Sequence, residues 1–204
     1  MTITVSLHID VASPNCYMSH KLIPGIEERQ NVTFEYFPVL LGGLFKLTNN
    51  QAPFITYKDV KNKPEYNRLE MTRFIRDHDM NKFQMNDHFP INTVPLMRGA
   101  IVAEQEGFLM SYLDAILNDM WENNRNMGDP DVIAAALTEH GFDADHILNR
   151  IQDQDVKDQL MANTQKSATM GVFGCPTMFV GDEMFFGKDR MDAVEREIIR
   201  QKKT

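Results

Sequence analysis

Residues 171–190, GVFGCPTMFVGDEMFFGKDR, constrain the fold more than any other part of the chain. The pair Cys175-Pro176 precedes a β-branched and aromatic run, 177–180, and a Gly-Asp turn leads to a second such run, 183–186. A helical pattern then begins at Asp189. The order predicts a proline, two strands joined by a hairpin turn, and a helix. Proline gives a sheet no N–H, so its place before a strand favours a cis peptide bond that turns the preceding backbone outward.

The N-terminal part of the chain predicts a strand, a helix and a second strand. Residues 2–9, TITVSLHI, alternate in the manner of a strand, and 31–39, NVTFEYFPV, do the same. Between them, Ser13 followed by Pro14 fits a helix N-cap with proline at the first helical position. We expect Pro24 to end or kink this helix early. The crossover is long enough for the two strands to pair in parallel.

The sequence predicts that most of the middle of the chain is helical. Residues 42–63 show no period and are expected to be irregular, either functional or disordered. Amphipathic patterns and caps then predict six helices within 64–170. The strands at both ends therefore form one α/β, thioredoxin-like fold (β-α-β … β-β-α) with a large all-helical insertion. The predicted domains are a thioredoxin-like domain of residues 1–63 and 171–204 and an inserted helical domain of residues 64–170.

Composition narrows the partners and the compartment. The 204 residues carry a net charge of −8 and no basic run that could follow a phosphate backbone, so we expect no nucleic acid partner. The apolar runs are too short to cross a bilayer, and the N-terminus lacks the basic region of a signal peptide. We therefore expect a cytoplasmic protein that binds no membrane and whose two cysteines are free thiols. The six histidines lack ligand spacing, so no metal site is predicted.

The first predicted helix begins with the tetrapeptide Ser13-Pro14-Asn15-Cys16. In a thioredoxin-like fold this helix N-terminus is the working site, because its unpaired N–H groups and its dipole favour an anion. Serine stands where a C-x-x-C motif has its first cysteine. Its hydroxyl cannot exchange disulfides, but it can donate a hydrogen bond to an external thiolate. The alternative is that Ser13 serves only as an N-cap.

Three segments resemble one enzyme family. Residues 10–14 (DVASP), 172–179 (VFGCPTMF) and 186–191 (FGKDRM) are similar to the 2-hydroxychromene-2-carboxylate isomerases and the kappa-class glutathione transferases. These enzymes belong to the DsbA-like thioredoxin superfamily. The resemblance covers nearly the whole chain, including the helical insertion. It implies glutathione as the cofactor, a small aromatic or unsaturated substrate, and a homodimer.

The resemblance also implies site residues. By it, Ser13 holds the glutathione sulfur, and Cys175 and Pro176 pair with the cysteinyl backbone as a β-strand would. Lys188 and Asp189 bind the γ-glutamyl end.

Two further residues rest on looser matches to the family. Asn50 matches a glutathione-binding asparagine, and Lys63 matches a lysine near the glycine carboxylate.

The two cysteines depart from the family pattern. Many members have another residue at the position of Cys16 and an aliphatic one at that of Cys175. We expect both to lie near the site, either as small buried hydrophobic residues or, less in keeping with the pattern, in a mixed disulfide with glutathione.

The sequence therefore favours a glutathione-dependent isomerase of the hydroxychromene carboxylate type, with Ser13 as the catalytic residue. The alternatives are a kappa-like glutathione transferase and a DsbA-like thiol–disulfide oxidoreductase that uses Cys16. A binding module without enzymatic activity is a third alternative.

Overall fold

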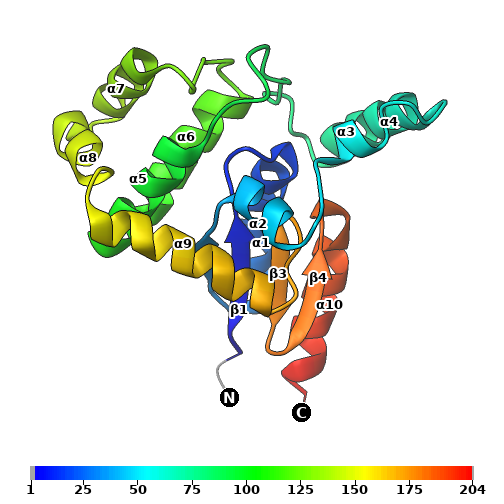
Figure 1. Cartoon of the computed structure of the whole chain (residues 1–204). Coiled ribbons are helices and arrows are strands. Elements are labelled where there is room, and N and C mark those ends of the chain that lie inside the picture. Colours follow the sequence, from blue (N-terminus) through cyan, green and yellow to red (C-terminus); the bar gives the residue numbers. More distant parts are fainter. Residues whose placement is uncertain (1–2, 204) are drawn as a thin grey trace.

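A four-stranded mixed sheet forms the centre of the molecule in the computed structural model, which describes residues 3–203. The strands lie in the order β2-β1-β3-β4. Their bounds are β1 Val5–Ile9, β2 Phe34–Pro38, β3 Thr177–Val180 and β4 Glu183–Phe186. Helices cover the sheet and extend beyond its upper end, toward both the left and the right of the view (Figure 1).

The sheet has the predicted topology. Strand β1 pairs in parallel with β2, in the register Leu7 to Tyr36, and antiparallel with β3. Helix α1 (Pro14–Gln30) makes the parallel crossover, and β3 and β4 form the predicted hairpin. The Cys175–Pro176 bond is cis, as predicted. The predicted first strand began at Thr2, which lies outside the described residues; the observed strand begins at Val5.

The insertion contains the six helices that the sequence predicts, each within a few residues of its expected bounds. Aspartates cap two of them, since Asp129 accepts from the N–H of Asp131 and Asp143 from that of His146. The chain closes with a 3-10 turn and a final helix. The bounds are α4 Lys63–Asp77, α5 Val94–Gln105, α6 Leu109–Trp121, α7 Pro130–Glu139, α8 Ala144–Arg150, α9 Gln154–Thr169, η1 Lys188–Arg190 and α10 Met191–Gln201.

Two local predictions are wrong: that the first helix ends at Pro24, and that residues 42–63 are irregular throughout. Helix α1 runs through Pro24 to Gln30, because Ile23 and Ile26 on either side of the proline are buried in the core. That burial outweighs the local cost of the missing hydrogen bond. The stretch expected to be irregular also contains two short helices, α2 (Leu41–Leu47) and α3 (Pro53–Thr56).

One hydrophobic cluster spans the sheet and the insertion. It runs from Leu7 in the sheet to Trp121 in α6, and both side chains are fully buried. Helix α9 packs against α2, β2 and α5 and so joins the two parts. The packing ties the insertion to the end of the sheet at which β1 meets α1.

None of the helices within residues 3–203 combines the length and the apolar character that a bilayer crossing demands.

Candidate functional site

Ser13 occupies the N-cap position of α1, but its hydroxyl does not cap the helix. The backbone of Ser13 is extended, and Pro14 follows it at the start of the helix. Its Oγ instead donates a hydrogen bond to the carbonyl oxygen of Cys175 at 3.1 Å. The side chain is almost fully buried, with 6% exposed. The hydroxyl of Ser13 therefore does not cap the helix, which is the role that the alternative interpretation gives it.

The cis-proline segment forms the second wall of the site. The carbonyl of Cys175 faces Ser13, and the carbonyl of Pro176 accepts from the N–H of Gly187 at 3.0 Å. Gly187 has a φ of 96° and directly precedes the turn η1. These two bonds bring Ser13, Cys175-Pro176 and the start of η1 together, as the sequence predicts.

Lys188 and Asp189 form an ion pair at that turn. The Lys188 side chain is buried, and its Nζ lies 4.2 Å from the centre of the Phe74 ring in α4, a cation–π distance. The Asp189 side chain is largely exposed, at 68%. The pair thus presents its carboxylate to solvent, while helix α4 covers its ammonium group.

Asn50 lies beside the loop that leads to Cys175. Its Nδ2 donates to the carbonyl oxygen of Phe173 at 3.0 Å, and its Oδ1 accepts from the N–H of Gln51. The structure therefore brings this predicted residue to the same end of the sheet as Ser13.

Lys63 is the predicted residue that the geometry connects least with the others. It begins α4, and its Nζ lies 5.6 Å from the ring centres of both Tyr57 and Tyr66. Phe74, which contacts Lys188, follows 11 residues later, or about 16 Å along a helix. A role for Lys63 at the glutathione site stays a prediction.

The loop of residues 10–13 holds groups whose roles the sequence left open or did not indicate. Asp10 is fully buried, and burial raises the pKa of its carboxyl group. The carboxylate accepts from the hydroxyl of Thr93 at 2.9 Å, and the indole Nε1 of Trp121 donates to the carbonyl of Val11 at 3.0 Å. The sequence leaves two roles open for Asp10, one in the turn and one in capping or tuning the site. It carries no signal for Thr93, because the contact spans 83 positions.

Cys16 and Cys175 are free thiols that lie side by side in the core of the site. Cys16 is 0% and Cys175 6% exposed. Burial, together with the contact with Cys16, raises the pKa of the Cys175 thiol well above its usual value. A protonated, enclosed thiol is a poor nucleophile. The burial of both cysteines supports the first of the two alternatives, small buried groups.

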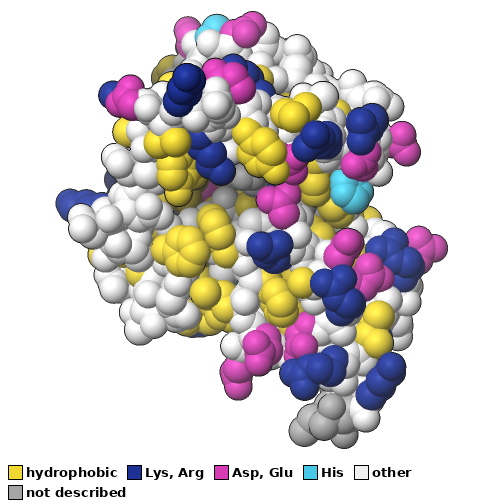
Figure 2. Space-filling model, turned by 90° about the vertical axis from the view of Figure 1, so that its right-hand side faces the viewer, with side chains coloured by type: hydrophobic (Ala, Val, Ile, Leu, Met, Phe, Trp, Pro, Cys, Tyr) yellow, Lys and Arg dark blue, Asp and Glu magenta, His cyan; other side chains and the backbone are white. Residues whose placement is uncertain are grey.

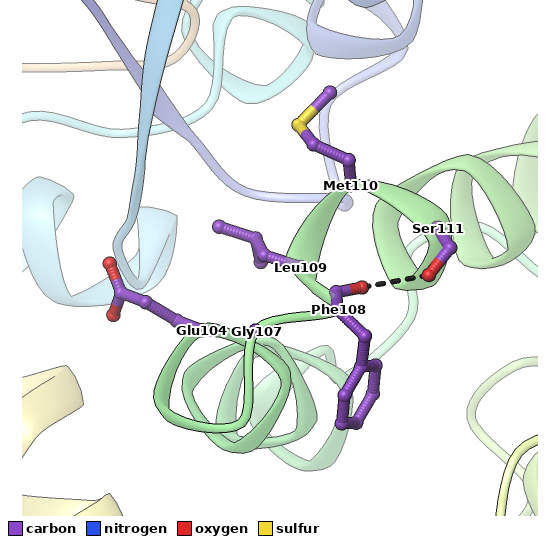
Figure 3. Close-up of a pocket in the computed structure, with 6 residues that line it drawn as sticks. All are labelled: Glu104, Gly107, Phe108, Leu109, Met110 and Ser111. Atoms are coloured by element: carbon purple, nitrogen blue, oxygen red, sulfur yellow. Dashed lines mark hydrogen bonds between the residues drawn. The ribbon is translucent and has the colours of Figure 1, made fainter.

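A hollow of about 470 Å³ lies elsewhere, at the turn between α5 and α6. The side chains of Glu104, Leu109 and Met110 border it, while the ring of Phe108 points away from Met110 (Figure 3). It lies at the opposite end of α5 from Thr93, about 18 Å along the helix. Its lining includes none of the predicted site residues.

The first turn of α1 carries no acidic side chain, so the helix dipole favours an anion at this end, while the buried carboxyl group of Asp10 lies in the adjoining loop. The arrangement can stabilise an anion beside Ser13, at the edge of a cis-proline strand.

These features define a thioredoxin-like protein in which a serine stands at the position of the first redox cysteine. Residues 4–199 match the DsbA-like thioredoxin domain. The chain belongs to the DsbA-like thioredoxin family.

Similar proteins cover nearly the full chain. A glutathione S-transferase kappa 1 of Rattus norvegicus is 26% identical over 92% of this chain and 87% of its own length. A 2-hydroxychromene-2-carboxylate isomerase of Sphingobium xenophagum is 22% identical over 98% and 100%. A solved structure of a 2-hydroxychromene-2-carboxylate isomerase superposes with a TM-score of 0.82, at 22% identity over 97% of this chain and 95% of that one. The family resemblance and the fold inferred from the sequence are confirmed.

Proposed function

We propose that the protein is a glutathione-dependent isomerase of the 2-hydroxychromene-2-carboxylate isomerase type. The observation that carries this proposal is the hydroxyl of Ser13, which faces the carbonyl of Cys175 at the N-terminus of α1. When bound, glutathione would supply a thiolate for reversible addition to an electron-poor carbon of an aromatic or unsaturated carboxylate. Ser13 would donate a hydrogen bond to that sulfur, and the N-terminus of α1 would favour its negative charge.

The carbonyl of Cys175 fits the peptide backbone of glutathione. A side-chain hydroxyl, and not a neighbouring strand, satisfies this carbonyl in the structure. An incoming cysteinyl N–H can therefore replace the hydroxyl as donor, as in the addition of a strand to a sheet. That replacement releases the Ser13 hydroxyl to point at the sulfur.

The turn at Lys188 and Asp189 suits the other end of the tripeptide. A γ-glutamyl group carries one carboxylate and one ammonium group, and the exposed carboxylate of Asp189 would pair with that ammonium group, while Lys188 lies buried beside it under α4. Asn50 would contact the tripeptide from the opposite side, next to Phe173. Lys63 would bind the glycine carboxylate only if the start of α4 moves toward the site.

The aromatic rim beside Cys175 supports an aromatic substrate. The rings of Phe173 and Phe186 lie 4.5 Å apart, and both are partly exposed. Phe173 lies two residues before Cys175, and Phe186 precedes Gly187, which is bonded to Pro176. The rim offers a surface on which a flat ring can stack.

Two other activities are alternatives. The first, a transferase, differs from the isomerase only in its product, and the second, an oxidoreductase, fits the structure less well. A kappa-like transferase would use the same thiol site and release the conjugate; the similarity to the rat transferase favours it as second candidate. A thiol–disulfide oxidoreductase would need Cys16 as nucleophile, and Cys16 is fully enclosed. The two free thiols suit the reducing cytoplasm, which we propose as the compartment.

A Ser13→Ala variant tests the role of the hydroxyl. Since a hydrogen bond to a charged group contributes about 1.5–3 kcal/mol, we expect the pKa of bound glutathione to rise by about one to two units. The turnover of hydroxychromene carboxylate should fall about 10²-fold. Thiolate absorbance of the binary complex, followed against pH, and steady-state rates measure the two effects.

Ser19→Ala provides the matched control. Ser19 lies in the same helix, is fully buried, and its Oγ has no hydrogen-bond partner in the part of the chain that the structure describes. Its removal should leave the thiolate and the rate unchanged. An unchanged thiol pKa in the Ser13→Ala variant would refute the proposed role. Glutathione recovered unmodified after turnover indicates an isomerase; a conjugate formed with a chloronitroaromatic electrophile indicates a transferase.

We also propose that the protein forms a homodimer through the projecting helices α3 and α4. Large hydrophobic side chains are exposed on these helices and on the segment between them, among them Phe54, Val60, Tyr66 and Leu69, each near half exposure. Figure 2, which faces this side of the molecule, shows hydrophobic patches between basic and acidic side chains. An equilibrium sedimentation mass of one chain at micromolar concentration would refute the dimer.

A further inference from the structure

The short loop that carries Ser13 is held in place by the helical insertion. Residues 10–13 connect β1 to α1, and two of their main-chain groups bond to insertion side chains. The N–H of Val11 donates to the Sδ of Met97 at 3.5 Å, and its carbonyl accepts from the Nε1 of Trp121 at 3.0 Å. All three residues are fully buried. The loop is therefore fixed from outside the sheet.

Asp10 is the central acceptor of this loop. Its Oδ1 accepts from the N–H of Ala12 and from the hydroxyl of Thr93, both at 2.9 Å, and its Oδ2 accepts from the N–H of Leu41 at 2.7 Å. Its carbonyl also accepts from the N–H of Ser13 at 3.1 Å. A fully buried carboxylate is tolerated only with such donors. Asp10 thus joins the serine loop to the start of α2 and to the insertion.

Thr93 donates its hydroxyl hydrogen to Asp10 and does not cap the helix that it precedes. It stands at the N-cap of α5, where a threonine hydroxyl ordinarily accepts a bond from the first turn. Within residues 3–203 no such cap bond is formed, and the buried hydroxyl donates to Asp10. The helix therefore gains little from this hydroxyl, and the loop gains a contact.

We propose that Thr93 is a positioning residue that, through Asp10, fixes the geometry of Ser13. This inference rests on the proposed function, because the quantity it controls is the stabilisation of a thiolate by Ser13. Thr93 itself is one step removed from the thiolate, since its hydroxyl meets the carboxylate of Asp10 and the loop main chain carries the effect to Ser13.

A comparison of Thr93→Val with Thr93→Ser tests the inference. Valine keeps the shape and removes the donor, whereas serine keeps the donor. Because a small misplacement of a catalytic group costs one to two orders of magnitude, we expect Thr93→Val to lower kcat about tenfold or more. The KM for glutathione should change less than about twofold, since the binding contacts are untouched. Thr93→Ser should restore kcat.

The pKa of bound glutathione provides a readout that a purely structural role would not change. We expect Thr93→Val to raise it in the binary complex and Thr93→Ser to return it to the wild-type value. Thr138→Val is the control: Thr138 is an exposed threonine of the insertion, and its hydroxyl donates to the carbonyl of Ala134 in its own helix. An unchanged thiol pKa and kcat in Thr93→Val, with a fall in thermal stability alone, would overturn the inference.

Amide hydrogen exchange separates this inference from the proposed function. We expect the N–H groups of Ala12 and Ser13 to exchange faster in Thr93→Val than in wild type and Thr93→Ser, with or without glutathione. If wild type fails to lower the glutathione pKa, the proposed function fails, and the exchange rates alone decide whether Thr93 holds the loop. Equal exchange rates of these N–H groups in wild type, Thr93→Val and Thr93→Ser would refute the role of Thr93 in holding the loop.

Discussion

His8 shows how a single buried side chain makes the stability depend on pH. It lies in β1 between the rings of Phe37 and Phe179, and its Nδ1 bonds to the Oγ of Ser167 at 2.8 Å. That hydroxyl already donates to the carbonyl of Asn163, so the Nδ1–H of His8 donates to the hydroxyl. Burial, with Lys166 adding to it, lowers the pKa of His8 to about 4.

The sign of the effect follows from the direction of this shift. Between pH 6.5 and 4 the unfolded state binds a proton that folded His8 does not, so the free energy of unfolding falls as the pH falls. A shift of this size corresponds to about 3 kcal/mol. We expect His8→Gln to lose that part of the pH dependence, measured by urea unfolding across this range. Parallel curves for variant and wild type would contradict the assignment.

Alanine substitutions at two helical glycines, Gly99 and Gly42, are expected to change the stability in opposite directions. Helices α5 and α6 approach so closely at Gly99 that an added Cβ would lie 2.1 Å from the Oη of Tyr112, whose hydroxyl donates to the carbonyl of Leu96. We therefore expect Gly99→Ala to destabilise the protein by about 3 kcal/mol, since overpacking and a lost buried hydrogen bond act together. Thermal or urea unfolding measures the loss.

Gly42 in α2 is the control for this prediction. An added Cβ there meets no atom within 4 Å, so Gly42→Ala should stabilise the protein by about 0.5–1 kcal/mol through helix propensity. If Gly99→Ala also stabilised the protein, the close packing of α5 on α6 would be wrong.

The elements show where local sequence suffices and where it does not. The helices of the insertion could be predicted because their starts carry local signals, such as Asp129 and Asp143, which do cap α7 and α8. Helix α2 could not be predicted, because Gly42 and Gly43 disfavour a helix and interrupt the helical spacing of apolar residues. Its stability depends on the buried Leu44 and on the contact of Gly43 with Thr164, far along the chain.

The candidate site likewise contains residues that local motifs predict and contacts that they do not. Ser13, Cys175 and Pro176 stand in short motifs, so the sequence could indicate them, and the structure places them together. The bond between Asp10 and Thr93 could not be foreseen, because a hydroxyl at a helix start ordinarily caps that helix. Only the fold determines that it turns to another segment.

At the scale of the whole molecule, the continuous core predicts one cooperative unfolding transition. Trp121 belongs to the insertion, yet its indole bonds to the loop after β1, and α9 packs against both the sheet and α5. We therefore expect denaturant curves from Trp121 fluorescence and from far-ultraviolet circular dichroism to coincide. Two separate transitions would show that residues 64–170, the inserted helical domain of the sequence analysis, fold independently of the sheet.

The support given to the serine loop has an evolutionary consequence. Thr93, Met97 and Trp121 hold residues 10 and 11, and none of their hydrogen bonds reaches the side chain at position 13. Replacement of the Ser13 oxygen by sulfur would create a Cys-Pro-Asn-Cys motif, the spacing of dithiol redox centres. A single atom thus separates two chemistries on one scaffold, and a lineage can pass from one to the other without rebuilding the framework around that atom.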